Sequence, residues 1–389
     1  MNAKSSYSSS SLDALESFEG LESLEIIGGN FKVIAESSNS SSLRSLSSFK
    51  GLSGLKSIGG DFEVNAKSFY SSSLDALESF EGLSGLKSIG GDFEVNAKSF
   101  SYSSSLDALA SFEGLESLET IGGNFKVIGF SLESLSSFKG LSGLKSIGGD
   151  FEVGNLNSLE SFEGLSGLKS IGGDFEVGNL NSLESFEGLE SLETIGGNFK
   201  VIGPSLNFLA SFKGLSGLKS IGGDFEVNAK SSYSSFLDAL ESFEGLESLE
   251  TIGGNFKVIA ESSLFSLNSL ASFKGLSGLK SIGGDFEVNA KSSSSLNSLA
   301  SFEGLENLTN IGGGKLTISN CKSLNNIDIL KNIESLNDIS ITECSKLYDF
   351  CVLKNVVQNM SGTFYLNKNG YNPTKYQLLN GECSQIPQE

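Results

Sequence analysis

The chain has 389 residues, a formal net charge of −20, no His and a single Arg, Arg44. A strongly acidic chain repels nucleic-acid phosphates and anionic lipid surfaces, so nucleic acid is not an expected partner. The lack of His excludes catalytic triads, metal triads and proton relays that need imidazole. No apolar run is long enough for membrane insertion, and Met1–Ser6 lacks the apolar stretch of a secretory signal.

The triplet Ile-Gly-Gly marks an internal repeat. Its Ile recurs every 24 to 32 residues, from Ile27 to Ile311. The extra length falls between a Phe-x-Val segment and the next Leu, as in the insertion Asn65–Ser73. Stacked repeats tolerate such insertions because they become loops at one corner. The pattern predicts about twelve stacked coils and a length on the order of 55 Å.

The shortest repeat shows which side chains face the core. Its apolar positions are Leu159, Phe162, Leu165, Leu168, Ile171, Phe175 and Val177. A spacing of three fits neither a helix nor a long strand and indicates short segments that turn repeatedly. Phe175–Val177 alternates with a period of two, which predicts a strand with Glu176 facing outward. We therefore predict an all-β fold, a parallel β-solenoid.

Glycines recur at two places in nearly every coil. One follows Phe-Glu or Phe-Lys, as at Gly164, and the other is a pair such as Gly172 and Gly173. Glycine at a fixed offset indicates a positive φ or a close approach of two backbones. A phosphate-binding loop is the alternative, but no Gly-x-x-x-x-Gly-Lys-Ser/Thr motif follows a strand.

The coils are of two kinds with inverted charge. First-kind coils read Leu-Glu-Ser-Leu-Glu-Thr-Ile-Gly-Gly-Asn-Phe-Lys-Val, as at 115–127; second-kind coils read Leu-Ser-Gly-Leu-Lys-Ser-Ile-Gly-Gly-Asp-Phe-Glu-Val, as at 141–153. The charged residues at the strand centres, here called the strand-centre ladder, are Lys32, Glu63, Glu94, Lys126, Glu152, Glu176, Lys200, Glu226, Lys257 and Glu287. Stacking brings many opposite charges together, and cross-strand pairs in sheets contribute about 0.2–1 kcal/mol. The ladder serves either register and solubility or recognition of a ligand.

Two groups of carboxylates break the alternation. They are Asp61, Glu63, Asp92 and Glu94, and Asp150, Glu152, Asp174 and Glu176. Such clusters either bind calcium through oxygen or are ordinary solvated charges beside lysines. A glycosidase would need one distinctive carboxylate pair in a cleft, which a repeated ladder does not offer. We expect no catalytic, cofactor-binding or metal-binding residue, no cofactor, and therefore no enzyme.

The repeat becomes irregular after Ile311, and all four Cys lie in this part of the chain. Cys351 and Cys383 bracket the final segment, so a disulfide between them would staple it. Cys321 and Cys344 occupy equivalent positions one coil apart and would form a second disulfide if their side chains converge. Buried free thiols are the alternative for both pairs. We predict three regions: a Ser-rich segment 1–10, a solenoid 11–350 and a cap 351–389.

The motif Leu-x-x-Leu-x-x-Ile-Gly-Gly-Asp-Phe-x-Val resembles the receptor L-domain type of leucine-rich repeat over roughly residues 11–350. The segment around Leu347–Cys351 and Tyr371–Thr374 resembles the closing part of secreted leucine-rich surface proteins of Bacteroidetes. The resemblance implies a right-handed β-solenoid that is secreted or displayed on the cell surface, often with a lipid anchor. It carries no catalytic residue. The near-identity of the coils departs from the family pattern.

A chain of this kind has four candidate functions. A binding or adhesion module for an extracellular protein or glycan is favoured by the ladder and by Ser- and Tyr-rich loops such as Ser68–Ser71 and Ser231–Ser234. A structural spacer or surface-layer rod is the alternative, because the coils are nearly identical. An enzyme lacks a unique site, and ice binding normally uses Thr arrays. The oligomeric state does not follow from the sequence.

Overall fold

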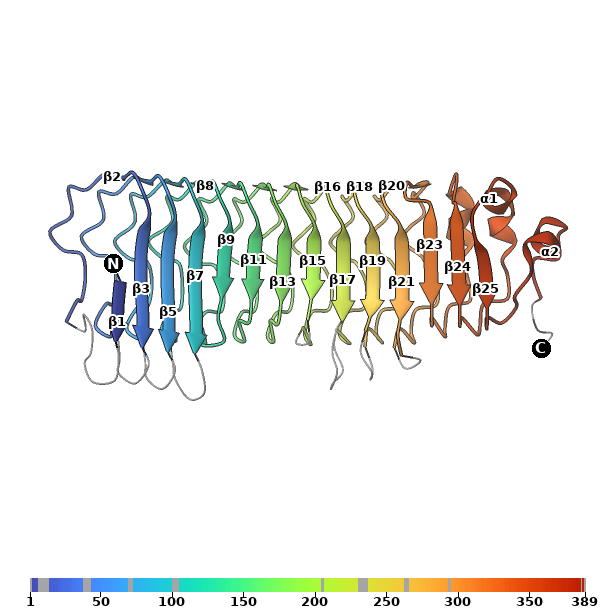
Figure 1. The fold of residues 1–389 in the computed structure, drawn as a ribbon, viewed down its shortest axis with the longest axis horizontal. Coiled ribbons are helices and arrows are strands. Elements are labelled where there is room, and N and C mark those ends of the chain that lie inside the picture. The colour runs from blue at the N-terminus through green and yellow to red at the C-terminus, as the bar shows by residue number, and fades with distance from the viewer. Residues whose placement is uncertain are drawn as a thin grey trace. The chain divides into compact units, whose positions relative to one another are not determined.

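The computed structural model describes residues 2–5, 14–37, 43–68, 73–99, 105–203, 206–229, 237–261, 266–292, 295–385 and 387. The chain forms two compact units, unit 1 (Met1–Thr194) and unit 2 (Ile195–Glu389). Each unit consists of parallel strands stacked in register, with few helices (Figure 1). The predicted parallel β-solenoid is confirmed in this form, whereas the number of twelve coils stays a prediction.

Unit 1 contains two parallel ladders, one of long strands and one of short strands. The long strands, in spatial order, are β1 (Asn2–Ser5), β3 (Phe31–Ser37), β5 (Phe62–Ser68), β7 (Phe93–Ser99), β9 (Phe125–Ile128), β11 (Phe151–Gly154) and β13 (Phe175–Gly178). The short strands end in the Ile of each Ile-Gly-Gly triplet and are β2 (Ile26–Ile27), β4 (Ser57–Ile58), β6 (Ser88–Ile89), β8 (Thr120–Ile121), β10 (Ser146–Ile147) and β12 (Ser170–Ile171). The repeat spacing did not predict this second ladder.

Unit 2 continues the same pattern and adds short helices. Its long strands are β15 (Phe199–Ile202), β17 (Phe225–Ala229), β19 (Phe256–Ala260), β21 (Phe286–Ala290), β23 (Lys315–Ser319), β24 (Asp338–Thr342) and β25 (Phe364–Asn367). Its short strands are β16 (Ser220–Ile221), β18 (Thr251–Ile252), β20 (Ser281–Ile282) and β22 (Asn310–Ile311), and β14 (Thr194–Ile195) lies at the boundary between the units. The helices are η1 (Asp328–Asn332), η2 (Cys351–Leu353), α1 (Lys354–Gln358) and α2 (Lys375–Leu379).

Stacked phenylalanines fill the core of each unit. Because the register is fixed, the Phe of each strand lies on the Phe of the next, and the Phe before each Phe-x-Gly turn forms a second column. In unit 1, neighbouring rings within a column have centroids 5.0–5.7 Å apart. The predicted apolar positions of the shortest repeat, including Phe162 and Phe175, are all buried. Each stacked aromatic pair stabilises the fold by about 0.5–1.5 kcal/mol beyond the contribution from burying its apolar surface.

Glycine is required at the two repeat positions for different physical reasons. Gly164 has a φ of 104°, in the left-handed region that favours glycine. A Cβ on Gly172 would lie 2.2 Å from the carbonyl oxygen of Gly148 in the preceding coil. A Cβ on Gly173 would lie 2.1 Å from Asp150 Oδ1. The prediction of a positive φ or a close backbone approach is therefore confirmed, with one reason at each place.

The parallel sheets extend past the predicted limits of the solenoid. Residues 2–5, assigned to a Ser-rich N-terminal segment, form β1, which pairs with β3. Strand β25 lies inside the predicted cap 351–389 and pairs in parallel with β24. Its Phe364-Tyr365-Leu366 sequence still alternates between half-buried and exposed side chains, which is enough to continue the sheet without Gly-Gly. Among the described residues, no helix has the length and apolar character needed to cross a membrane.

Candidate functional site

In unit 1 the strand-centre ladder contains ion pairs between neighbouring strands. Lys32 Nζ lies 2.9 Å from Glu63 Oε2 and 3.4 Å from Asp61 Oδ2. The hydrogen bond to Glu63 raises the pKa of Lys32 more than desolvation lowers it. Lys126 and Glu152, which pair across β9 and β11, also form an ion pair. The ladder thus holds its side chains in defined positions on the outward face of the strands.

In unit 2 the pairing differs in one respect. Lys257 Nζ lies 2.7 Å from Asp224 Oδ2, so this lysine forms an ion pair with the carboxylate that immediately precedes β17. Burial raises the pKa of Asp224, but the hydrogen bonds from Lys257 and Asn255 outweigh it and the net shift is downward. Glu226 and Glu287 instead accept hydrogen bonds from the Asn two residues later, at 3.0 and 3.1 Å.

Where two second-kind coils are adjacent, the parallel register places two ladder carboxylates side by side. Glu63 pairs with Glu94 across β5 and β7, and Glu152 pairs with Glu176 across β11 and β13. Asn65 Nδ2 donates to Glu63 at 3.2 Å, and an equivalent bond reaches Glu94. These amides partly offset the repulsion between neighbouring carboxylates. Within the described ranges, no group of three or more Cys, Asp or Glu side chains is arranged to hold a metal ion.

The Asp members of the two carboxylate groups have a structural role. Asp61 Oδ1 accepts a hydrogen bond from the amide of Asp92 at 3.2 Å, and Asp150 Oδ1 accepts one from Asp174 at 2.8 Å. Asn30 and Asn124 make the same bond to the next coil, as do Asn198, Asp224 and Asn255 in unit 2. We call this column the Asn/Asp ladder. Sequence reasoning missed it, although Asn or Asp after every Gly-Gly from Ile27 to Ile282 was a visible signal.

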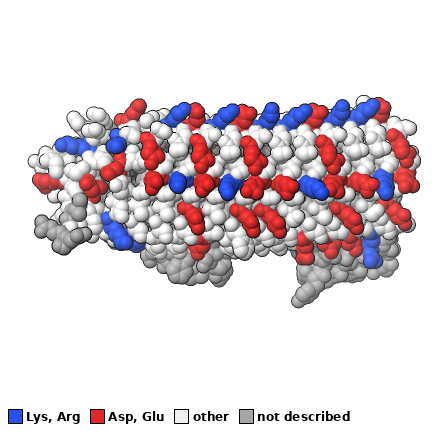
Figure 2. Space-filling model, turned by 180° about the vertical axis from the view of Figure 1, so that it is seen from behind, with Lys and Arg blue, Asp and Glu red and all other residues white. Residues whose placement is uncertain are grey.

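Further charge rows lie on the face shown in Figure 2. The residues two positions before each Ile pair across coils, as in Lys56 with Glu25 at 2.8 Å and Lys280 with Glu250 at 2.9 Å. Unit 1 also carries a groove of about 510 Å³, lined by residues that include Glu116, Lys139, Ser142 and Ser166. The Glu116 carboxylate folds back onto the amide of Gly114 at 3.0 Å. The smaller Ser of second-kind coils leaves the surface hollow.

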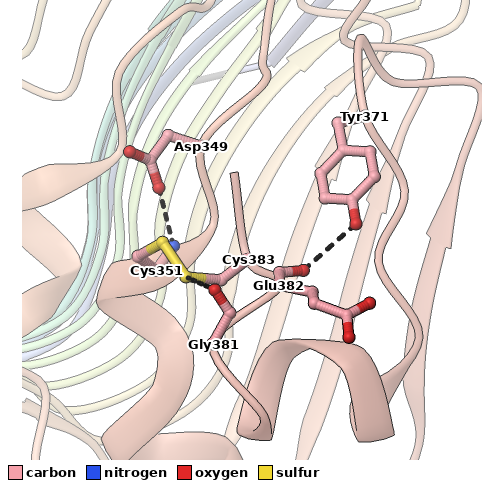
Figure 3. The surroundings of a disulfide bond; sticks show 6 residues. All are labelled: Asp349, Cys351, Tyr371, Gly381, Glu382 and Cys383. Carbon is pink, nitrogen blue, oxygen red and sulfur yellow. Dashed lines mark hydrogen bonds between the residues drawn. A yellow bond between two sulfur atoms is a disulfide. The ribbon is translucent and has the colours of Figure 1, made fainter. Parts of the chain in front are cut away.

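Cys351 and Cys383 form a disulfide, with Cα atoms 4.8 Å apart (Figure 3). Asp349 Oδ1 accepts a hydrogen bond from the amide of Cys351 at 2.8 Å, and the Tyr371 hydroxyl donates to the Glu382 carbonyl at 3.1 Å (Figure 3). The bridge therefore ties the end of the described chain to the start of η2. This is the pair that the sequence analysis placed at the two ends of the final segment.

Cys321 and Cys344 are buried free thiols, so the second predicted disulfide is absent from the structure. Each thiol also donates a hydrogen bond within its own coil, Cys321 to the Ser319 carbonyl and Cys344 to the Thr342 carbonyl. Stacked parallel coils hold equivalent Cβ atoms about 4.8 Å apart with parallel Cα–Cβ bonds, whereas a disulfide needs roughly 3.5–4.5 Å. Hydrogen bonding with Cys344, together with burial, raises the pKa of the Cys321 thiol.

No family model and no curated protein matches the sequence. One solved structure that is similar is described as "Crystal structure of TLR13-ssRNA13 complex"; it is 14% identical and covers 85% of this chain and 68% of that chain. Its TM-score is 0.23, so this likeness carries no argument about fold or function. The description of the fold as a leucine-rich-repeat-like solenoid therefore depends on the coils of this chain alone. The L-domain type and the Bacteroidetes origin stay predictions.

The Ser- and Tyr-rich loops that were predicted to recognise a ligand lie largely outside the described residues. Of Ser68–Ser71 only the backbone of Ser68 is described, and Ser231–Ser234 is outside altogether. The strand-centre ladder is thus the predicted recognition surface whose geometry the structure gives.

Proposed function

We propose that the protein is a non-catalytic, secreted or cell-surface repeat module that binds a protein or glycan through the outward face of its long strands. The observation that carries this proposal is the ion-paired strand-centre ladder. Lys32, Glu63, Lys126 and Glu152 are held by neighbours on a sheet whose strands repeat at a constant spacing. A row of fixed charges suits a ligand that itself repeats, because many weak contacts then act together.

The disulfide between Cys351 and Cys383 supports the location outside the cytoplasm. Disulfides persist in oxidising compartments and are rare where thioredoxin and glutathione keep thiols reduced. The acidic composition supports a ligand other than nucleic acid.

A binding screen with a charge-swapped variant tests the proposal. The purified chain is screened against extracellular proteins and glycans at physiological salt, and each hit is repeated with Lys126→Glu/Glu152→Lys. This swap keeps an ion pair but reverses two charges of the ladder. The matched control, Glu119→Lys/Lys145→Glu, reverses an equivalent ion pair outside the ladder. We expect the ladder swap to abolish binding and the control to keep it; equal binding by both would contradict a role for the ladder.

A structural spacer is the second candidate, favoured by the uniformity of the layers. The Phe columns and the Asn/Asp ladder recur from coil to coil, and such repetition builds a rigid support without a unique surface. A well-folded chain that yields no saturable hit in the screen would favour the spacer over the binding module.

A further inference from the structure

In unit 2, where the repeat becomes irregular, two successive turns line a cavity of about 350 Å³. One is the turn at 301–306, the other is η1 of the next coil, and both lie in the continuous described range 295–385. The side chains that matter for binding are the apolar Phe302 and Ile329 and the charged Glu303, Glu306, Asp328 and Lys331. Ligand pockets in proteins measure about 300–1,000 Å³, so this volume suits one side chain or a small organic molecule.

The cavity follows from one departure from the repeat. The Asn325 amide donates to the Ala300 carbonyl of the preceding coil, and this register places Ile329 at the repeat position of Gly304. Gly304 has a φ of 108°, which a β-branched side chain disfavours. The chain therefore forms the 3-10 helix η1 in place of a glycine turn, and Ile329 stays half-buried. Two turns of different shape stack imperfectly, and the cavity lies between them.

The charges of the cavity select the kind of ligand. Three carboxylates line it against the single ammonium of Lys331, so its field favours a cation and repels an anion. The apolar side chains Phe302 and Ile329 stabilise a ligand that also has an apolar part. A bare metal ion would gain nothing from these two side chains. The lining therefore fits an organic cation.

The polar groups are held in place without a ligand. Glu306 Oε1 accepts a hydrogen bond from the Gly304 amide at 2.9 Å. Asn326 Nδ2 donates to Asp328 Oδ2 at 3.0 Å, while the Asp328 amide donates to Asn326 Oδ1 at 2.7 Å. Asn332 Nδ2 donates to the Glu306 carbonyl at 2.8 Å and so ties η1 to the preceding turn. Binding therefore orders few side chains, which lowers its entropic cost.

We propose that this cavity, here called the cation pocket, binds an alkylammonium or guanidinium group on a short apolar stem. The head group lies among the three carboxylates, and the stem packs against Phe302 and Ile329. A Lys or Arg side chain of a partner protein and a free alkylamine share this chemistry. The cation pocket is built from turns and not from long strands, so the inference goes beyond the proposed ligand of the strand-centre ladder and does not depend on it.

The first test titrates small probes into the full chain and follows amide resonances by NMR. The cationic probes are the N-acetyl methylamides of lysine and arginine; that of norleucine keeps an aliphatic stem without the charge. We expect the cationic probes to shift the amides of 301–306 and 326–332 saturably, and norleucine to bind at least about tenfold more weakly. Equal binding of norleucine, or no saturable shift with either cationic probe, would overturn the proposal.

n-Butylamine distinguishes the two sources of the cation. If it binds as tightly as the lysine probe, the pocket recognises a free amine, because the peptide groups add nothing. If the lysine probe binds more tightly, the pocket recognises a side chain presented by a polypeptide.

A matched pair of variants tests the carboxylates. Glu303→Gln/Glu306→Gln removes two charges of the cation pocket while keeping the side-chain shapes, and should weaken the lysine probe about tenfold. The control is Glu244→Gln/Glu247→Gln, in a turn with the same Phe-Glu-Gly-Leu-Glu sequence and the same hydrogen bond to its glycine amide. The turn after it keeps a glycine, Gly275, with a φ of 106°. The control should bind as the unmodified chain does; equal weakening in both would reduce the effect to net charge and overturn the proposal.

Lys331 provides a test in the opposite direction. Lys331→Met removes the one ammonium of the lining and should tighten binding of the lysine probe severalfold, a gain that misfolding cannot produce. Unchanged or weaker binding would contradict the proposed charge selection. The ladder swap Lys126→Glu/Glu152→Lys should leave binding of the probe unchanged, so failure of the cation pocket and failure of the ladder are separate results.

Discussion

At the scale of single residues, the close stacking of the coils depends on glycine. The Gly-Gly pairs have no positive φ, so their role is space and not backbone freedom. The carbonyl oxygen of Gly148 stands where a Cβ on Gly172 would be, at 2.2 Å. Any side chain there must push two coils apart and lengthen the hydrogen bonds of the neighbouring ladder.

We predict that Gly172→Ala destabilises the protein by about 1–3 kcal/mol or more, because overpacking against backbone cannot be relieved by a rotamer change. The control is Gly28→Ala, the same repeat position in the first described coil, where a Cβ meets nothing within 4 Å. That change should be near neutral. Urea denaturation of both variants measures the difference, and similar losses in the two would refute the steric account.

The ion pair of Asp224 and Lys257 predicts a pH dependence. The folded-state pKa of Asp224 lies below its ordinary value, so its stabilisation is present above the unfolded pKa of about 3.9 and is lost as pH falls through the folded pKa. We expect Lys257→Met to cost about 0.5 kcal/mol at pH 7, since solvent screens a partly exposed pair. The cost should fade below pH 4 in urea titrations. Exposed Lys331→Met is the control, and a cost that persists at low pH would argue for packing instead of charge.

At the scale of elements, stacked Phe side chains give the core a regular order. Phe162 lies 5.6 Å from Phe138, 5.5 Å from Phe186 and 6.1 Å from Phe175, measured between ring centroids. Within unit 2, regular stacking ends at Phe302, which meets Phe273 edge-on, with ring planes 69° apart. Regular stacking is therefore a property of the repeat and not of Phe alone.

We predict that Phe162→Ala costs about 3–5 kcal/mol, because it removes a ring from the middle of a column and leaves a cavity between two coils. Phe130→Ala, at a side chain that is 59% exposed, should cost less than about 0.5 kcal/mol. Thermal or urea unfolding distinguishes the two. A small effect at Phe162 would mean that neighbouring rings collapse into the gap.

The sequence predicted the strands and the core because both follow directly from spacing. Phe175, Glu176 and Val177 alternate as a strand must, and Leu159 to Ile171 recur at the interval of the turns. The short strands at Ser170–Ile171 were missed because two residues carry no periodicity. The Asn/Asp ladder was missed because its bonds join residues 24 to 32 positions apart, and spacing along one coil does not reveal them.

The candidate site was only partly predictable for a related reason. The opposite charges of Lys126 and Glu152 and of Lys32 and Glu63 could be aligned from the sequence, and the structure pairs them. The partner that Lys257 finds in Asp224 could not be foreseen, since a long side chain selects among several carboxylates within reach. The free thiols Cys321 and Cys344 show that equivalent positions in stacked coils do not by themselves produce a disulfide.

At the scale of the whole molecule, the coil is the unit of construction. Nearest-neighbour contacts dominate in such stacks, so stability is close to a sum over coils and interfaces. In unit 1, removing one complete shortest repeat preserves every register. Deletion of Ile147–Ser170 joins Ser146 to Ile171 and so restores the Ser-Ile sequence of the native short strand. In the shortened chain, Lys126 of β9 lies beside Glu176 of β13.

We predict that this deletion variant folds with the same circular dichroism per residue and unfolds cooperatively, with a slightly smaller m-value because less surface is exposed. Deletion of only Ile147–Ser158, half of the same repeat, should prevent native folding because it shifts the core residues out of register. Far-UV dichroism and urea titration test both. A folded half-repeat variant would show that coils tolerate slippage within a turn.

The alternation of charge between coils has a consequence for how the chain reaches its native state. Coils with nearly the same core can stack on the wrong partner, leaving one or more coils looped out, and such traps slow the folding of repeat proteins. If the first-kind coil at 112–127 skips the two second-kind coils before it and stacks on the first-kind coil at 18–33, Glu119 lies next to Glu25 and the like charges repel each other. Electrostatic repulsion thus disfavours coils stacked in the wrong order. Because salt screens this repulsion, high salt should slow refolding more than it lowers the free energy of unfolding.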